Sequence, residues 1–333
     1  MLVLGIESSC DETAAALVLS GSTILSSSVA SQIDTHHPYG GVVPELASRK
    51  HIESIVPVVE DALKKAGKTP GQIDAVSVTQ GPGLIGSLLV GYSFAKGYAY
   101  ALGIPWVGIN HLEGHVNSVF LTQAPPAFPF TALLASGGHT GIYHVVSHTE
   151  IEIMGQTRDD AAGEAYDKVA KMLGLGYPGG HVIDGMAKKG DLFNIPFPKP
   201  YLDKNAFDFS FSGIKTAVSR YIQKHTDTFS DNIPDIAAGF QESVVEVLTH
   251  KLIMAAEIKG VNHVAVVGGV AANTYLRKRI EGAAAEKGLS VHIPPPELCG
   301  DNAAMIAATG YHYLKKGDRS SMDSDVFSKV KVK

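Results

Sequence analysis

The sequence predicts an α/β fold of two mixed-sheet domains that face each other across a cleft. The first observation is an internal repeat, in which three short apolar runs precede alternating helices and strands, and this order occurs twice. The second is a proline-rich seam at 123–129 between the copies, and the third is a long insertion at about 157–230 in the second copy. We therefore expect a first repeat over 1–128, a second over 129–325 and a basic tail over 326–333.

The first repeat begins with a three-stranded meander, because its short apolar runs are joined by tight polar turns. A long helix follows, since apolar side chains recur there at helical spacing. The expected elements are strands at 2–7, 14–19 and 23–31, a helix at 44–66, a strand at 75–79, a helix at 84–102, a strand at 105–109 and a helix that starts near 111.

The second repeat has the same order. The expected elements are strands at 130–135, 141–147 and 151–155, a helix at 233–258, a strand at 263–267, a helix at 273–287, a strand at 290–293 and a helix at 302–315. Ligands of such folds bind at strand ends, on the turns beside the cleft. The turns SSCDE (8–12) and SGGHT (136–140) occupy the same place in each repeat, so both are candidate ligand loops.

Composition narrows the class of protein. The 333 residues are 45% hydrophobic and carry a formal net charge of −5, so the chain as a whole does not attract nucleic acid or membranes. The two cysteines exclude a disulfide scaffold and suit a reducing compartment. We predict a cytoplasmic protein without a signal peptide or a membrane span, in which RNA binding would need a local basic patch or a partner.

The stretch HLEGH (111–115) is the candidate metal site. If it is helical, His111 and His115 lie one turn apart on the same face. Glu113 lies about 200° round the helix from His111, which argues against a role as the base of a metalloprotease. Asp301 is a candidate third ligand, although it could instead cap a helix. Two histidines and one carboxylate suit Fe(II) or Zn(II), while the alternative is a pair of solvent or capping histidines.

Two glycine-containing turns are candidate nucleotide sites. In SGGHT, Gly137 and Gly138 let backbone N–H groups approach an anion, although an ordinary hairpin turn has the same sequence. In VVGGVAAN (266–273), a strand runs through two glycines into a helix, where Asn273 could contact a ribose or a base. A tight strand-to-helix turn is the alternative.

Acidic residues form two further candidates. Asp11 and Glu12, in the first turn, could act as a base, hold a metal-bound water or position an amine, or they could belong to a simple polar turn. In the insertion, Asp167, Gly180 and Asp184 could form the wall of a polar ligand pocket.

Seven motifs in order resemble a known family: GIESSCDETAAA, GPGLIGSL, NHLEGH, SGGHT, DDAAGEAYDKVAKMLGL, YPGG and GGVAAN. Over almost the whole chain the sequence resembles the bacterial tRNA N6-adenosine threonylcarbamoyltransferases. The resemblance implies a duplicated actin/Hsp70/sugar-kinase-like (RNase H-like) fold. It also implies an iron-like divalent metal at His111, His115 and Asp301. The substrate site that it implies consists of Ala135, Ser136, Gly137, Gly138, His139, Asp167, Gly180, Asp184 and Asn273.

The implied reaction transfers threonylcarbamoyl from threonylcarbamoyl-AMP to N6 of adenosine 37 in tRNAs that read codons beginning with A. The implied partners are the tRNA, a degenerate paralogue of the same fold (TsaB-like) and a P-loop ATPase (TsaE-like). The alternatives are a nucleotide-driven switch or ATPase, a kinase of the same fold and, least favoured, a metalloprotease. Only the transferase and the protease account for the histidine pair.

Overall fold

The computed structural model describes residues 1–201, 203 and 206–329, so part of the expected basic tail lies outside the described residues. The chain forms two compact units. Unit 1 combines Met1–Pro125 with Gly300–Lys333, and unit 2 is Pro126–Cys299.

A five-stranded mixed sheet forms the centre of unit 1. Its strand order is β3-β2-β1-β4-β5, with β1 antiparallel to β2 and parallel to β4. The strands are β1 (Leu2–Glu7), β2 (Glu12–Leu19), β3 (Thr23–Ser31), β4 (Ala75–Gly81) and β5 (Trp106–Asn110). Every residue of β1 is buried, which explains why this strand reads as a continuous apolar run.

Unit 2 contains a second sheet of the same kind, with the order β10-β9-β6-β7-β8. The strands are β6 (Phe130–Ala135), β7 (Thr140–Ser147), β8 (Glu150–Gln156), β9 (His263–Val267) and β10 (Ser290–His292). When β6 to β10 are matched to β1 to β5, both sheets have the same order and the same mixture of parallel and antiparallel pairs. The predicted duplication is therefore confirmed.

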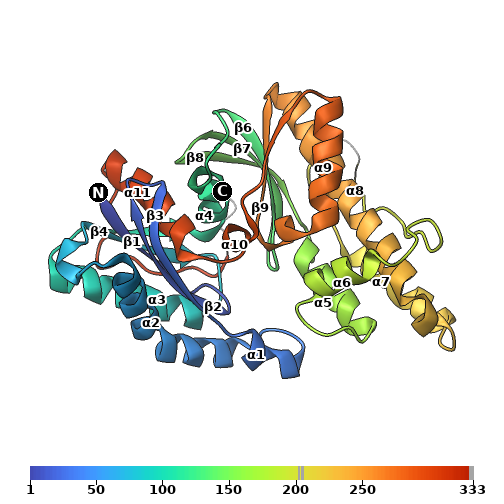
Figure 1. Cartoon of the computed structure of the whole chain (residues 1–333), viewed down its shortest axis with the longest axis horizontal. Coiled ribbons are helices and arrows are strands. Elements are labelled where there is room, and N and C mark those ends of the chain that lie inside the picture. The colour runs from blue at the N-terminus through green and yellow to red at the C-terminus, as the bar shows by residue number, and fades with distance from the viewer. Residues whose placement is uncertain (202, 204–205, 330–333) are drawn as a thin grey trace. The chain divides into compact units, whose positions relative to one another are not determined.

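Helices cover both faces of the sheet of unit 1. Leu4 and Ile6 of β1 belong to the core formed with α2 (Pro44–Ala66) and α3 (Ile85–Leu102). Gly5, which points to the opposite face of the strand, meets α11 (Ala303–Lys316). Figure 1 accordingly shows α2 and α3 on one side of the sheet and α11 on the other. The short helices α1 (Ile33–His36) and α4 (His111–Asn117) complete the N-terminal segment.

The place of α11 differs from the expectation that residues 129–325 form one unit. This helix packs on β1, β2, β4 and β5, so the segment from Gly300 onward belongs to unit 1. The contact is close because small residues line it: a Cβ added at Gly5 would lie 2.1 Å from the carbonyl oxygen of Ala303, and one added at Gly310 would lie 2.1 Å from Ser77 Oγ. Ser77 Oγ also donates a hydrogen bond to the carbonyl of Ile306 at 2.7 Å.

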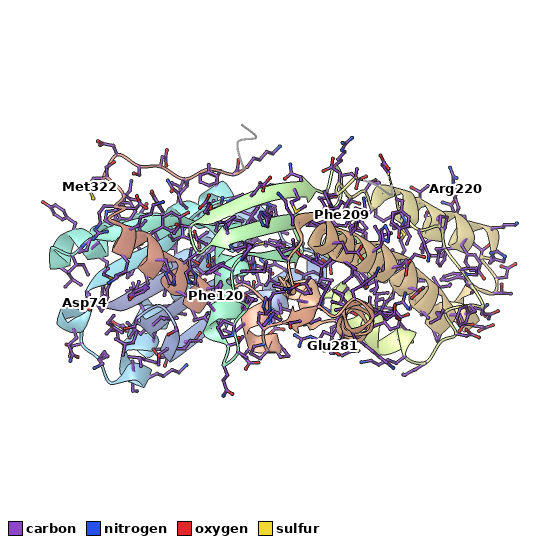
Figure 2. The ribbon with its side chains drawn as sticks, turned by 90° about the horizontal axis from the view of Figure 1, so that it is seen from above. Asp74, Phe120, Phe209, Arg220, Glu281 and Met322 are labelled. Carbon is purple, nitrogen blue, oxygen red and sulfur yellow. The ribbon has the colours of Figure 1, made fainter. Side chains whose placement is uncertain are left out.

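Unit 2 is completed by α5 (Ala162–Met172), α6 (Gly179–Ala187), α7 (Ser212–Lys224), α8 (Ile233–Lys259), α9 (Thr274–Glu286) and α10 (Pro296–Cys299). The helix α8 packs on β6 and contacts α6 and α9 (Figure 1). The insertion returns to the sheet at Phe209, which is fully buried and is labelled in Figure 2. Its backbone bridges β8, because Phe209 N donates to the carbonyl of Gln156 at 3.1 Å.

Among the described residues, no helix combines the length and the apolar character needed to cross a bilayer.

Candidate active site

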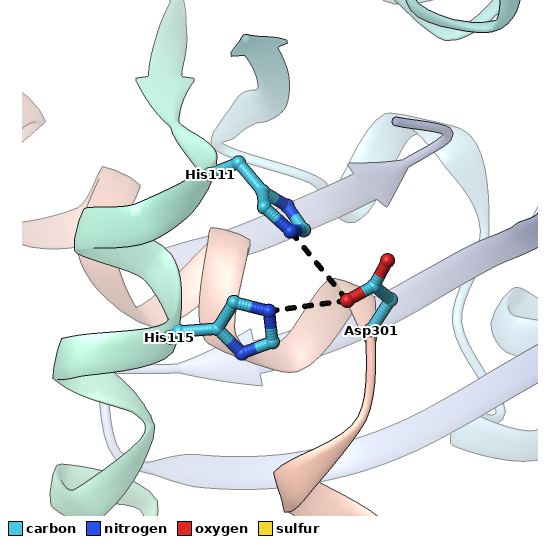
Figure 3. A group of neighbouring side chains, drawn as sticks. All are labelled: His111, His115 and Asp301. Carbon is cyan, nitrogen blue, oxygen red and sulfur yellow. Dashed lines mark hydrogen bonds and ion pairs between the residues drawn. The ribbon is translucent and has the colours of Figure 1, made fainter. Parts of the chain in front are cut away.

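Three side chains of unit 1 converge on one point (Figure 3). His115 Nε2 lies 3.1 Å from Asp301 Oδ1, and His111 Nε2 lies 3.5 Å from the same oxygen. The candidate ligand atoms of the three residues all lie within 4.8 Å of one another. Both histidines are buried, and Asp301 is largely so. The structure therefore brings together the three residues that the sequence identified as metal ligands.

Local structure explains this convergence. The helix α4 starts directly after β5, and its N-cap Asn110 accepts a hydrogen bond from Leu112 N at 2.9 Å. This start places both histidines on the α4 face toward Asp301, with ring centroids 4.6 Å apart. The N-cap of α11 is Asn302, which accepts from Met305 N at 2.9 Å, so the side chain of Asp301 is not needed as a cap.

A fourth side chain, the carboxylate of Glu7, lies against the outer nitrogen of His111 and was not identified from the sequence. Glu7 Oε2 lies 3.1 Å from His111 Nδ1. Glu7 is itself fully buried, and it accepts hydrogen bonds from Ser9 N at 2.6 Å and from Thr79 Oγ1 at 2.5 Å. A carboxylate on the outer nitrogen of a ligating imidazole fixes the ring and its tautomer. The only sequence signal was a charged residue at the end of an otherwise apolar strand.

The charges in this cluster stabilise one another. Burial alone would lower the pKa of His111, but the carboxylates of Asp301 and Glu7 outweigh burial and raise that pKa well above its usual value. Burial would raise the pKa of Asp301, but His111 and His115 hold it well below the usual range. In the same way, His111 lowers the pKa of Glu7 despite complete burial. The cluster is therefore a site that attracts positive charge.

The donor set fits a divalent metal ion. With its Nδ1–H donating to Glu7, His111 presents Nε2 to a metal ion, which would displace the proton that the raised pKa favours on this nitrogen; Nε2 faces the same carboxylate oxygen as His115 Nε2. Two imidazoles and one carboxylate that leave other positions open are typical of zinc and non-haem iron sites.

Glu113, the residue that a protease would need, is engaged elsewhere. Its Oε2 accepts a hydrogen bond from Tyr313 Oη at 2.6 Å, and burial raises the pKa of its carboxyl. This contact joins α4, which carries both candidate histidines, to α11, which begins two residues after Asp301, so Glu113 contributes to the packing beside the candidate metal site.

The acidic turn after β1 lies against the same centre. Ser9 Oγ lies 3.3 Å from His111 Nδ1, while Asp11 is buried. Burial, the neighbouring charge of Asp11 and the charge of Asp301 together raise the pKa of Glu12 to about 9. Glu12 Oε1 accepts a hydrogen bond from Ser31 Oγ at 3.1 Å.

The SGGHT turn of unit 2 is a tight hairpin between β6 and β7. Ser136 N donates to the carbonyl of His139 at 2.8 Å, and His139 N donates to Ser136 Oγ at 3.1 Å. Ala135 is the last residue of β6, and Gly137 and Gly138 at the tip are exposed. The α5 start packs on this turn, where Gly163 N donates to the carbonyl of Ser136 at 3.1 Å.

The other residues of the expected substrate site also belong to unit 2. Asp167 Oδ1 accepts from Gly179 N at 2.7 Å, next to Gly180, so the carboxylate ties α5 to the start of α6. Asp184 accepts from Thr274 Oγ1 at 2.9 Å and pairs with Lys188 at 3.1 Å.

Asn273 is committed to two protein contacts. Its Oδ1 accepts from Leu276 N at 2.8 Å as the N-cap of α9, and its Nδ2 donates to Gln241 Oε1 at 2.7 Å. A pocket of about 250 Å³ lies here, lined by Ala187, Lys188, Gln241, Thr274, Tyr275 and Lys278. Gln241 was missed by the sequence analysis because a glutamine within the long α8 carries no motif signal.

Comparison with known proteins agrees with this geometry. A family model described as tRNA N6-adenosine threonylcarbamoyltransferase matches residues 23–308. The chain is 60% identical over 331 residues to the protein of that name from Desulforapulum autotrophicum, covering 99% of each chain. It is 54% identical over 325 residues to the one from Geobacter sp. (strain M21), covering 98% of this chain and 95% of the relative.

Solved structures of lower identity show the fold. The ROK hexokinase from Thermus thermophilus aligns with a TM-score of 0.52 at 15% identity, over 95% of this chain and all of that chain (100%). HypF from T. kodakarensis aligns with a TM-score of 0.64 at 14% identity, over 95% of this chain and 48% of that chain. The predicted actin- and sugar-kinase-like fold is therefore confirmed. With the match to the family model and the near full-length relatives, the chain belongs to the tRNA N6-adenosine threonylcarbamoyltransferase family.

Proposed function

We propose that this chain transfers the threonylcarbamoyl group from threonylcarbamoyl-AMP to N6 of adenosine 37 in tRNAs that read codons beginning with A. Membership of the family supports this activity. The observation that carries it is the buried His111–His115–Asp301 cluster backed by Glu7, which has the donor set of a metal site and which neither a kinase nor a nucleotide switch requires.

In this reaction the amine nitrogen of adenosine bonds to the carbonyl carbon of the carbamoyl group. The bond from that carbon to the phosphate oxygen breaks, AMP leaves, and the amine gives up a proton. The amine is a weak nucleophile, so holding it close to the carbonyl contributes much of the rate.

His111, His115 and Asp301 would hold one divalent ion, which we propose to be Fe(2+), with Zn(2+) as the alternative. Such an ion supplies Lewis acidity toward an oxygen of the acyl group. Glu7 keeps His111 in the tautomer that presents Nε2, and burial keeps competing water away from the ligands.

Two carboxyl groups of the acidic turn are candidates to receive the amine proton. Burial and the charges of Asp11 and Asp301 raise the pKa of Glu12, so this carboxyl favours its protonated form. We therefore propose Asp11 as the acceptor, with Glu12 as its hydrogen-bonding neighbour.

In unit 2, we propose that the adenine nucleotide binds at Ala135–His139, Asp167, Gly180, Asp184 and Asn273. The exposed backbone of Gly137 and Gly138 supports phosphate binding, because no side chain blocks the approach of an anion there. Gln241 accepts a hydrogen bond from the side-chain amide of Asn273, so it orients this residue of the proposed nucleotide site.

We also propose two protein partners, the degenerate paralogue and the P-loop ATPase, besides the tRNA itself. The net charge of −5 supports RNA binding that depends on partners. Four exposed apolar side chains on adjacent helices α2 and α3 support docking of the paralogue: Ile52, Val56, Ile85 and Leu89. Val56→Asp should weaken this association in analytical ultracentrifugation, whereas Glu60→Gln on the same helix should not.

The decisive experiment incubates the chain and its partners with threonylcarbamoyl-AMP and tRNA that lacks the modification, and measures the nucleoside by mass spectrometry. Asp301→Ala should lose bound metal and most of the product, and Asp323→Ala, which removes an exposed carboxylate of the same unit, should lose neither. No product from the wild type would overturn the proposed activity. Full activity of Asp301→Ala without metal would remove the metal from the mechanism.

A further inference from the structure

A buried histidine on α2 holds the acidic turn at both ends. His51 is fully buried, and its Nε2 lies 3.0 Å from the carbonyl oxygen of Cys10. Its Nδ1 lies 2.8 Å from Thr13 Oγ1. Cys10 and Thr13 directly flank Asp11 and Glu12, so a single imidazole spans the acidic pair.

The partners determine the tautomer of this ring. A backbone carbonyl can only accept, so Nε2 carries the hydrogen and donates it to Cys10. Nδ1 is then the acceptor, and the hydroxyl of Thr13 donates to it. Burial lowers the pKa of His51, which keeps the ring neutral and this acceptor available at physiological pH.

Other segments of unit 1 also hold the acidic turn. Leu84 N donates to the carbonyl of Ser9 at 2.8 Å, and Gln32 N donates to the carbonyl of Asp11 at 3.0 Å. Ser9 Oγ reaches His111 Nδ1 at 3.3 Å. The turn is thus attached to a metal ligand through Ser9 and to helix α2 through His51.

We propose that His51 is a positioning residue for the transfer reaction, whose neutral imidazole sets where the carboxyl groups of Asp11 and Glu12 stand relative to the metal centre. The inference rests on the proposed function. It requires no contact between His51 and the substrate, because the ring acts through the backbone of Cys10 and the hydroxyl of Thr13.

Thr13→Val provides the main test, because it removes the hydroxyl at nearly constant shape and leaves the bond from His51 to Cys10 in place. In the reconstituted assay, kcat should fall about tenfold or more, since small displacements of a catalytic group are costly. KM for threonylcarbamoyl-AMP and for tRNA should stay within about twofold, and the metal content should stay that of the wild type. Amide hydrogen exchange across residues 9–12 should become faster.

Four further variants separate positioning from general stability. Thr13→Ser keeps a hydroxyl and should restore kcat to within about twofold of the wild type. His51→Phe should match Thr13→Val, and the double variant should lose no more than either single one. Val59→Ala, in the core on the same helix, should lower the melting temperature while kcat stays unchanged.

The inference would be overturned if Thr13→Val kept the kcat of the wild type. It would also be overturned if Thr13→Ser lost as much kcat as Thr13→Val, or if Val59→Ala lost as much kcat at the same melting temperature as Thr13→Val. If His51→Phe does not fold, the Thr13 variants still decide. Failure of the proposed function is distinct, because the wild type itself would then yield no modified nucleoside.

Discussion

Glu7 Oε2 and His111 Nδ1 lie 3.1 Å apart, and both groups are buried in unit 1. The pair joins the end of β1 to the first residue of α4, so the central strand of the sheet orients a candidate metal ligand directly.

The first prediction concerns this pair. Glu7→Gln should weaken metal binding about 10- to 100-fold, because it removes the charge that fixes the His111 tautomer while keeping the shape of the side chain. Metal affinity is measured by competition with a chromophoric chelator. Thr79→Val removes one support of Glu7 and should show a smaller effect in the same direction. Unchanged affinity in Glu7→Gln would show that Glu7 does not support the site.

The second prediction concerns Glu113. Glu113→Gln should keep the transfer activity within about twofold, since the carboxylate of Glu113 is hydrogen-bonded to Tyr313 and is not one of the three candidate metal ligands. Tyr313→Phe should lower the free energy of unfolding by about 0.5–1.5 kcal/mol through loss of that hydrogen bond. Urea denaturation and the nucleoside assay measure the two effects. A metalloprotease would instead lose all peptide hydrolysis in Glu113→Gln.

The third prediction concerns the packing of α11. Gly310→Ala should destabilise the protein by about 1–3 kcal/mol, because the new methyl group would lie 2.1 Å from Ser77 Oγ. Ser77→Gly should recover part of that loss in the double variant, although it also removes the hydrogen bond to Ile306. Strict additivity of the two changes in a denaturation cycle would contradict the contact.

The fourth prediction concerns His312, whose pKa burial lowers to about 4 from an ordinary value of 6.5. As the pH falls, His312 takes up a proton at a higher pH in the unfolded chain than in the folded chain. The buried neutral ring therefore makes its full contribution to the free energy of unfolding above pH 6.5, and this contribution is lost between pH 6.5 and 4. Between pH 6.5 and 4, the free energy of unfolding should fall by about 1–3 kcal/mol less in His312→Phe than in the wild type. Denaturant titrations between pH 4 and 8 measure it, and an unchanged slope in the variant would refute it.

The sequence was sufficient for the succession of strands and helices along the chain and for the histidine pair, for identifiable reasons. Apolar runs separated by polar turns occur in both repeats. On a helix, the four-residue spacing of His111 and His115 places both side chains on the same face. The buried face of α11, by contrast, includes small residues such as Ala303 and Ala307 that fit either sheet, and contacts such as the one with Gly5 show which sheet it covers.

The supporting residues were harder to predict because their roles depend on distant partners. Glu7 has a role at the site only because the chain after β5 places His111 beside it. His51 has a role only because α2 packs against the acidic turn. Neither belongs to a local motif whose spacing carries a chemical meaning.

The return of α11 to unit 1 affects the order in which this protein is made. On a ribosome, the strands of unit 1 emerge first, but Asp301 and the helix behind it are translated after the whole of unit 2. The first unit to begin folding is therefore the last to finish. A chain interrupted before residue 301 has both histidines yet lacks the carboxylate, so the proposed three-residue metal site is complete only after synthesis has passed residue 301.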